Sequence, residues 1–206
     1  MNRFLALASA VALAFGLGAC GKPIGTVAGF ALEDRSVEDH GLDTKIEASV
    51  FGKVTQIDKM LAIDLTTNAW EGRVLLTGIV EEARLRDAAV RAARETQSVK
   101  VVYNDIVVVT KADAERMRKA KEAGKAGKEE PKSDFVINAK IKAALVGASS
   151  VTSVNYRWES VNNTVSILGR AGSAEEKNLV MALIKAVDGV KGVKDYVEIK
   201  PVAKKN

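Results

Sequence analysis

An internal repeat divides the chain into two similar halves. Residues 74–78 read VLLTG and align with residues 165–169, which read VSILG, at an offset of 91 positions that the following stretch keeps. Similarity at one fixed offset indicates that the same structural unit occurs twice. The apolar stripe of the amino-terminal helix instead fits an offset of 95, so we expect four additional residues between this helix and the first strand in the first copy. With an offset of 95, the three apolar residues of the first helix align with three of the second: Leu42, Ile46 and Val50 with Ile137, Ile141 and Leu145.

Each copy is predicted to begin with a helix and a β-hairpin. Apolar residues spaced four apart predict the helix, and alternating apolar residues over 63–69 and 154–160 predict the first strand. Two-residue turns at Glu71-Gly72 and Asn162-Asn163 then reverse the chain, because Gly and Asn tolerate the positive φ that such turns need. The resulting register sets Ala69 opposite Val74, Ser160 opposite Val165 and Trp158 opposite Ile167.

A second helix and a third strand complete each copy. In the second copy the helix begins at Ser173, with Glu176 three residues later as a capping box. The closing strands are expected at 101–109 and 194–200, and a helix between consecutive strands favours a parallel, right-handed crossover. The predicted fold class is therefore α+β. It consists of two tandem αββαβ modules, each a small three-stranded mixed sheet with both helices on one face.

Composition sets the expected boundaries of these modules. We place them at residues 35–110 and 133–200, followed by a tail at 201–206. The connecting residues 111–132 are a mixture of Lys, Ala, Glu and Gly with no apolar stripe. We therefore expect a charged linker, with a solvated helix that Gly and Pro end. A role in coupling the two modules is the alternative.

The first twenty residues resemble a bacterial lipoprotein signal. Arg3 precedes an apolar run from Phe4 to Leu17 that is too short for a permanent membrane span, and Leu17-Gly18-Ala19-Cys20 ends it. The resemblance implies that a signal peptide, residues 1–19, is removed. The alternative is an ordinary cleaved signal that leaves an unmodified thiol.

Cys20, the single cysteine of the chain, is the expected lipidation site. The same resemblance implies a covalent diacylglycerol and an N-acyl chain such as palmitate on this residue, and two or more chains give stable anchorage. Residues 20–34 would then form a lipidated tether. Asp after the cysteine favours the inner membrane in such lipoproteins, so Gly21 implies the periplasmic face of the outer membrane.

The repeat also carries a family resemblance. The pattern V-x-L-x-G, a helix, a Gly-Val pair and a closing strand of alternating apolar residues resembles the BON domain. The first copy departs from the pattern at Gln97-Ser98, where the family usually has Gly before Val99. Two copies behind a lipoprotein signal resemble the dual-BON outer-membrane lipoproteins, which implies non-enzymatic periplasmic modules associated with phospholipid membranes and envelope integrity. The second copy matches through Val165, Ile167, Gly169, Gly189-Val190, Val193, Asp195 and Val197.

Charge is distributed unevenly between the two modules. Residues 33–110 hold 10 basic and 14 acidic groups, a net charge of −4, whereas residues 133–206 hold 11 basic and 7 acidic groups, a net charge of +4. Such an asymmetry indicates that the basic half faces an anionic surface. The periplasm excludes nucleic acid, so membrane phospholipids, anionic ones above all, are the expected partner. The alternative is a basic excess that serves solubility only.

Residues for enzyme catalysis are scarce in this sequence. His40 is the only histidine and Cys20 is the expected lipid site, so neither a Ser/His nor a Cys/His nucleophile arrangement is available. A zinc site needs several His or Cys ligands, and this sequence has one residue of each type. We therefore expect no catalytic residue, no metal and no cofactor other than the covalent lipid, and we interpret His40 as a surface or capping residue.

The candidate lipid-binding residues lie at the start of the second module. Phe135-Val136 open its first helix, outside the apolar stripe, where an offset of 95 gives the first module His40-Gly41. An exposed aromatic residue among lysines is typical of a membrane-interface patch. Phe135 packed onto its own module or onto the first one is the alternative. The candidate set is Lys132, Phe135, Val136, Lys140 and Lys142.

A different function remains open on the sequence alone. The modules could serve as an envelope adaptor that binds a protein or peptidoglycan, with the lipid as the only membrane attachment. Three glycines are expected to be structural in either case: Gly78, Gly169 and Gly189. Gly78 and Gly169 end the second strand of each copy opposite Leu65 and Tyr156, where a side chain would crowd the packed face.

Overall fold

The computed structural model describes residues 33–127 and 132–200, so the predicted signal peptide, Cys20, Gly21 and the tail lie outside the described residues. The first repeat contains α2 (Val37–Ile57), α3 (Leu61–Asp64), β1 (Leu65–Trp70), β2 (Arg73–Val80), α4 (Ala83–Arg94) and β3 (Val101–Val108). α5 (Lys111–Lys125) connects it to the second repeat. That repeat contains α6 (Asp134–Gly147), η1 (Ser153–Asn155), β4 (Tyr156–Val161), β5 (Thr164–Ala171), α7 (Ala174–Lys185) and β6 (Gly192–Ile199). We call residues 33–110 module one and residues 133–200 module two.

The two modules have the same sheet topology, which confirms the predicted fold class. Each sheet has the strand order 1-2-3, with an antiparallel first pair and a parallel second pair joined by a helix. The predicted hairpin register is also correct: Ala69 pairs with Val74, Ser160 with Val165 and Trp158 with Ile167. Both turns have positive φ at their two central residues, as two-residue hairpins require.

The expected offset of 95 for the first helix is wrong. Every helix and strand that the repeats share follows the single offset of 91, and α2 is longer than α6 by six residues at its amino-terminal end and by one residue at its carboxy-terminal end. The buried residues of α2 are Ile46, Val50 and Val54, and those of α6 are Ile137, Ile141 and Leu145. No four-residue insertion therefore separates helix and strand in module one.

Polar contacts fix this alignment independently of the apolar stripe. Asp43 accepts hydrogen bonds from the backbone N–H groups of both residues in the turn 71–72, at 2.7 and 2.8 Å. Asp134, 91 residues later, accepts two bonds of 2.8 Å from the turn 162–163. Each first helix is thus tied to its own hairpin by one carboxylate.

The first strand of each module is shorter than predicted. Ile63 belongs to the short helix α3 and Val154 to the turn η1, so β1 begins at Leu65 and β4 at Tyr156. Tyr156 is buried in the core of module two and Trp158 packs against that core, as their alternation predicts.

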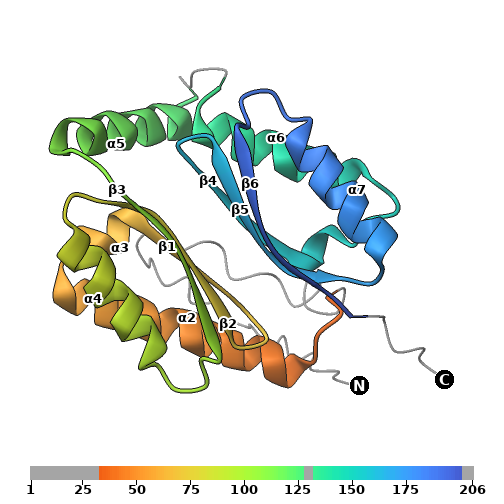
Figure 1. The fold of residues 1–206 in the computed structure, drawn as a ribbon, viewed down its shortest axis with the longest axis horizontal. Coiled ribbons are helices and arrows are strands. Elements are labelled where there is room, and N and C mark those ends of the chain that lie inside the picture. Colours follow the sequence, from red (N-terminus) through yellow and green to blue (C-terminus); the bar gives the residue numbers. More distant parts are fainter. Residues whose placement is uncertain (1–32, 128–131, 201–206) are drawn as a thin grey trace, which may run out of the picture.

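Helices cover one face of each sheet, and the other faces of the two sheets pack together (Figure 1). The contact consists of Trp70 and Leu75 from module one and Leu168 from module two, all fully buried. Tyr103 and Tyr196 stack beside them with ring centroids 4.1 Å apart. We call this contact between the sheets, together with residues 33–35, the seam. The layers are therefore helices, sheet, sheet, helices.

α5 is docked, contrary to the expectation of a solvated linker helix. Ala114 and Gly124 are buried. Arg118 binds Asp64 and Glu81 of module one, and Gly124 lies against the ring of Phe135 in module two. Because α5 contacts both modules, it contributes to their coupling. Within the part of the chain that the structure describes, no helix is long and apolar enough to cross a bilayer.

Candidate functional site

α6, which carries four of the five candidate lipid-binding residues, is held rigidly at its amino-terminal end. Ser133 is the N-cap and accepts a hydrogen bond from the Val136 N–H, while Asp134 binds the neighbouring turn. Ile137, Ile141 and Leu145 have no exposed surface. These contacts fix which side of the helix faces solvent.

The solvent-facing side of α6 is also apolar. At 100° per residue, Phe135, Ala139, Ala143 and Val146 form one stripe opposite the buried residues. Val146 is 65% exposed and Phe135 is 39% exposed. A surface helix normally has a polar outer side, so α6, which is apolar on both sides, is unusual. We call this stripe, with the flanking Lys140 and Lys142, the α6 face.

The structure adds members to the candidate set and shifts the role of others. The sequence-based candidate set lacks Val146, Ala139 and Ala143. Residues 134–147 have apolar residues on more than one side of a helix, and this pattern could have indicated them. Val136 is half-buried beside the stripe, and Lys132 pairs with Asp188 at 3.2 Å, both exposed. Lys140 and Lys142 are exposed on the two sides of the stripe.

Phe135 has a mixed environment. Its ring lies so close to Gly124 of α5 that a Cβ added there would be 2.7 Å from the ring. This contact is with the connecting helix, whereas the alternative expected Phe135 to pack onto its own module or onto module one. The residue as a whole is 39% exposed. The ring therefore connects the α6 face to α5.

The apolar stripe of the α6 face is not repeated at the equivalent positions of module one, although Phe51 of α2, which aligns with Lys142, is 53% exposed. At the offset of 91, Phe135-Val136 align with Thr44-Lys45 and not with His40-Gly41 as expected, and Val146 aligns with Thr55. The outer side of α2 is polar at these positions.

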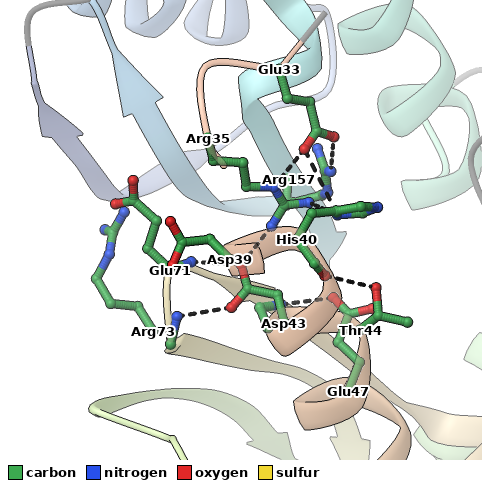
Figure 2. A network of polar contacts seen from close by, with 12 residues as sticks. Glu33, Arg35, Asp39, His40, Asp43, Thr44, Glu47, Glu71, Arg73 and Arg157 are labelled. Carbon is green, nitrogen blue, oxygen red and sulfur yellow. Dashed lines mark hydrogen bonds and ion pairs between the residues drawn. The ribbon is translucent and has the colours of Figure 1, made fainter. Parts of the chain in front are cut away.

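A buried ionic network closes one end of the seam (Figure 2). Arg35 donates hydrogen bonds to Glu33 and to Asp43, and the second oxygen of Glu33 accepts one from Arg157 of module two at 2.6 Å. Both guanidinium groups lie over the Trp70 indole, at 4.3 and 5.2 Å from its centroid. The side chains of Glu33, Arg35 and Asp43 are at most 7% exposed. The segment that precedes α2 therefore bridges the two modules.

Polar contacts continue along the seam. Arg73 of module one donates to the backbone carbonyls of Tyr196 and Gly169, at 2.9 and 3.0 Å. Asp105 accepts hydrogen bonds from the Lys194 ammonium and the Tyr196 hydroxyl, at 2.8 and 3.0 Å. Burial, with the nearby Asp105, raises the pKa of Tyr196 to about 12, so its hydroxyl stays protonated. These bonds fix the relative orientation of the modules.

His40 lies beside this network and not at a helix cap, which Ser36 provides. Its Nδ1 atom is 2.7 Å from the Arg35 guanidinium, so the ring accepts this hydrogen bond in its neutral form. Burial, and then the charge of Arg35, lower the pKa of His40 from 6.5. The interpretation as a capping residue is therefore wrong, and the other expected role, a surface residue, does not hold either, because the side chain is half-buried.

The lowered pKa predicts a pH dependence of stability. A group whose pKa is lower in the folded state favours folding above its unfolded pKa of about 6.5, and this contribution disappears as the pH falls through the folded value. We expect the free energy of unfolding to decrease between pH 7.5 and pH 5 in urea titrations. His40→Gln should show a smaller decrease over the same window, in which carboxylates remain mostly ionised. Equal decreases in both proteins would contradict this role.

The three candidate structural glycines all have positive φ. At Gly78 (φ 118°) a Cβ would lie 2.1 Å from the Asp64 carbonyl oxygen, and at Gly169 (φ 156°) 2.2 Å from that of Asn155. These two glycines pair with Leu65 and Tyr156 as expected. At Gly189 (φ 100°) a Cβ would lie 3.1 Å from Ile137, which is a tighter contact than usual. The crowding thus comes mainly from the backbone that enters the first strand.

Comparison with known proteins identifies a domain family for both modules. The model of the BON domain matches residues 42–110 and 133–201. An uncharacterized protein of Anaplasma centrale, from the gshII 5' region, is 36% identical over 136 residues, which cover 66% of this chain and 82% of that protein.

Two relatives have descriptive names. Osmotically-inducible protein Y of Escherichia coli K12 is 28% identical over 161 residues, 77% of this chain and 73% of its own. Outer membrane lipoprotein DolP of Haemophilus influenzae is 24% identical over 159 residues, 76% and 72% of the two chains.

Proposed function

This chain belongs to the BON-domain family, and we propose that it is a lipid-anchored protein of the outer membrane, on the periplasmic side, that binds anionic phospholipid through the α6 face of its second BON domain. In this role it would support envelope integrity. The relatives support an envelope-associated, periplasmic protein in general, since one is named an outer membrane lipoprotein. Neither of the two named relatives is described as an enzyme.

The observation that carries this proposal is the apolar outer side of α6. Exposed apolar residues that are contiguous and flanked by cations are typical of surfaces that enter the headgroup region of a bilayer. The stripe from Phe135 to Val146 covers a stretch of twelve residues, or about 16 Å along the helix axis. Lys140 and Lys142 flank it where lipid phosphates would lie.

The charge distribution favours module two as the membrane-binding half. Residues 133–200 carry a net charge of +2, and residues 133–206 a net charge of +4, while module one carries −4. The seam holds the modules in one orientation through hydrogen bonds that Arg73, Arg157 and Lys194 donate across it. A rigid seam keeps the acidic module at a fixed position relative to the α6 face, so its negative charge need not oppose membrane contact.

Vesicle binding by unlipidated protein tests this proposal. The full chain with Cys20→Ser cannot carry the lipid anchor, so any binding comes from the protein surface. We expect it to bind vesicles that contain phosphatidylglycerol and to bind pure phosphatidylcholine vesicles much more weakly in sedimentation assays, because each lysine near an anionic surface contributes about 1 kcal/mol. Absence of binding to both vesicle types would support the adaptor function, with the lipid as the only membrane attachment.

A further inference from the structure

A cleft lies between the two sheets, beneath α5. The sheets are in close contact around Trp70, Leu75 and Leu168, but toward the β4–β5 turn they leave a space of about 730 Å³. α5 leads from the end of β3 across to α6 (Figure 1). Its residues 116–121 line one side of this space. A volume of this size is within the range of pockets for small ligands, about 300–1,000 Å³.

The walls of the cleft are partly apolar and come from both modules. Ile79 belongs to β2, Met117 and Ala120 to α5, Phe135 to α6, and Val161 to β4. An elongated apolar group in the cleft would contact residues of both sheets, of α5 and of α6. The cleft would therefore remove such a group from water more completely than the α6 face alone.

Cations outnumber the available carboxylates around the cleft. Its lining includes a set of basic residues on α5 and before α6: Arg116, Arg118, Lys119, Lys121 and Lys132. The carboxylates there are engaged, since Asp64 binds Arg118, Asp134 binds the hairpin turn and Glu159 accepts a bond of 2.8 Å from the Asn138 amide. Three of the cations are in ion pairs as well: Arg116 with Asp113, Arg118 with Asp64 and Glu81, and Lys132 with Asp188. The positive charge that would complement an anion is therefore mainly that of Lys119 and Lys121.

The cleft adjoins the proposed membrane-binding surface at Phe135. Phe135 belongs both to the α6 face and to the cleft lining, and Lys132 lies beside it. A lipid that meets α6 at the bilayer surface would have a direct path from the face into the cleft.

We propose that this cleft receives one acyl chain of an anionic phospholipid, with the headgroup bound by the lysines at its rim. This inference rests on the proposed function and deepens it: the protein would hold a single lipid partly withdrawn from the bilayer in addition to touching the membrane surface. The apolar wall accounts for the chain, and the excess of cations accounts for the charge of the headgroup.

Monomeric lysophosphatidylglycerol, used below its micelle concentration, is a direct probe. We expect saturable binding, with one molecule per full chain carrying Cys20→Ser, in isothermal titration calorimetry. Lysophosphatidylcholine should bind about tenfold more weakly, because it lacks net charge, and glycerophosphoglycerol, which has no chain, should not bind. Equal binding of glycerophosphoglycerol, or no saturable binding of lysophosphatidylglycerol, would overturn the proposal.

Two substitutions on α5 separate the cleft from the α6 face. Ala120 and Ala112 are both exposed, but only Ala120 lines the cleft. Ala120→Trp should weaken lysophosphatidylglycerol binding at least about tenfold and leave binding to anionic vesicles intact. Ala112→Trp should change neither.

Equal lysophosphatidylglycerol affinity in the two tryptophan variants would overturn the cleft proposal. Vesicle binding by the parent protein without lysophosphatidylglycerol binding would reject the cleft and keep the α6 face. If the parent protein bound neither lysophosphatidylglycerol nor anionic vesicles, the proposed function itself would be rejected.

Discussion

Replacing Gly78 with Ala is expected to destabilise module one by about 3 kcal/mol, the upper end of what overpacking a core costs. The added Cβ would lie 2.1 Å from the Asp64 carbonyl oxygen and 2.9 Å from the Leu65 Cα. Both are backbone atoms, so no side-chain rotation relieves the contact. The positive φ of 118° adds strain for any residue with a Cβ. Gly169→Ala should have a similar effect in module two.

Gly52→Ala is the matched control for this result. Gly52 lies within α2 of the same module, and a Cβ there would have no atom within 4 Å. Alanine at such a helical position should stabilise the protein by about 0.4–1 kcal/mol. Urea titrations of the full chain, followed by circular dichroism, compare the three proteins. A free energy of unfolding for Gly78→Ala within about 1 kcal/mol of the parent would contradict the proposed crowding.

The strand register could be predicted because it depends on local information. A two-residue turn and an alternating pattern leave only one pairing that puts Ala69, Val74 and their neighbours on the same face. The helix register could not be fixed in the same way. Apolar residues spaced every four positions match themselves again after a shift of four, so offsets of 91 and 95 fit the stripe equally well.

Polar residues would have resolved this ambiguity. Asp43 and Asp134 each bind the turn of their own hairpin, and Glu47 and Asn138 each accept a backbone N–H of the first strand, at 2.7 and 3.0 Å. All of them follow the offset of 91. Their roles depend on contacts between segments distant in sequence, which apolar periodicity does not report.

The seam was not foreseen, since it depends on which sheet faces meet. Trp70 and Leu168 lie on the face away from the helices, where an isolated apolar residue is usually only half-buried. One sequence feature pointed to it: β2 contains a nearly continuous apolar run, and every residue of this strand is buried. Continuous burial of a strand indicates that both faces of the sheet are covered.

The candidate site was predicted in part. Phe135 could be predicted because it is an aromatic residue at a helix start, and the lysines because they lie near it in the sequence. Val146 lies three turns further along the helix, so it can be assigned to the same face only when the length of the helix is known. The cleft joins residues from β2, α5 and β4, so it depends on the docking of α5, which its polar sequence does not suggest.

Charge reversal on the α6 face should reduce vesicle binding strongly. Lys140→Glu with Lys142→Glu removes two cations and adds two anions next to the apolar stripe. At about 1 kcal/mol for each charge near an anionic surface, the loss amounts to at least 2 kcal/mol, roughly thirtyfold in affinity. Lys45→Glu with Lys59→Glu is the matched control, because it changes the net charge equally on exposed positions of module one.

Sedimentation of these two variants and their Cys20→Ser parent with phosphatidylglycerol vesicles, at low salt and at 1 M salt, tests the role of the α6 face most directly. We predict a loss of affinity for the α6 variant at low salt that largely disappears at 1 M, where the Debye length is about 3 Å, and a much smaller change for the control. Equal binding by the parent and the folded α6 variant at low salt would contradict membrane recognition by α6.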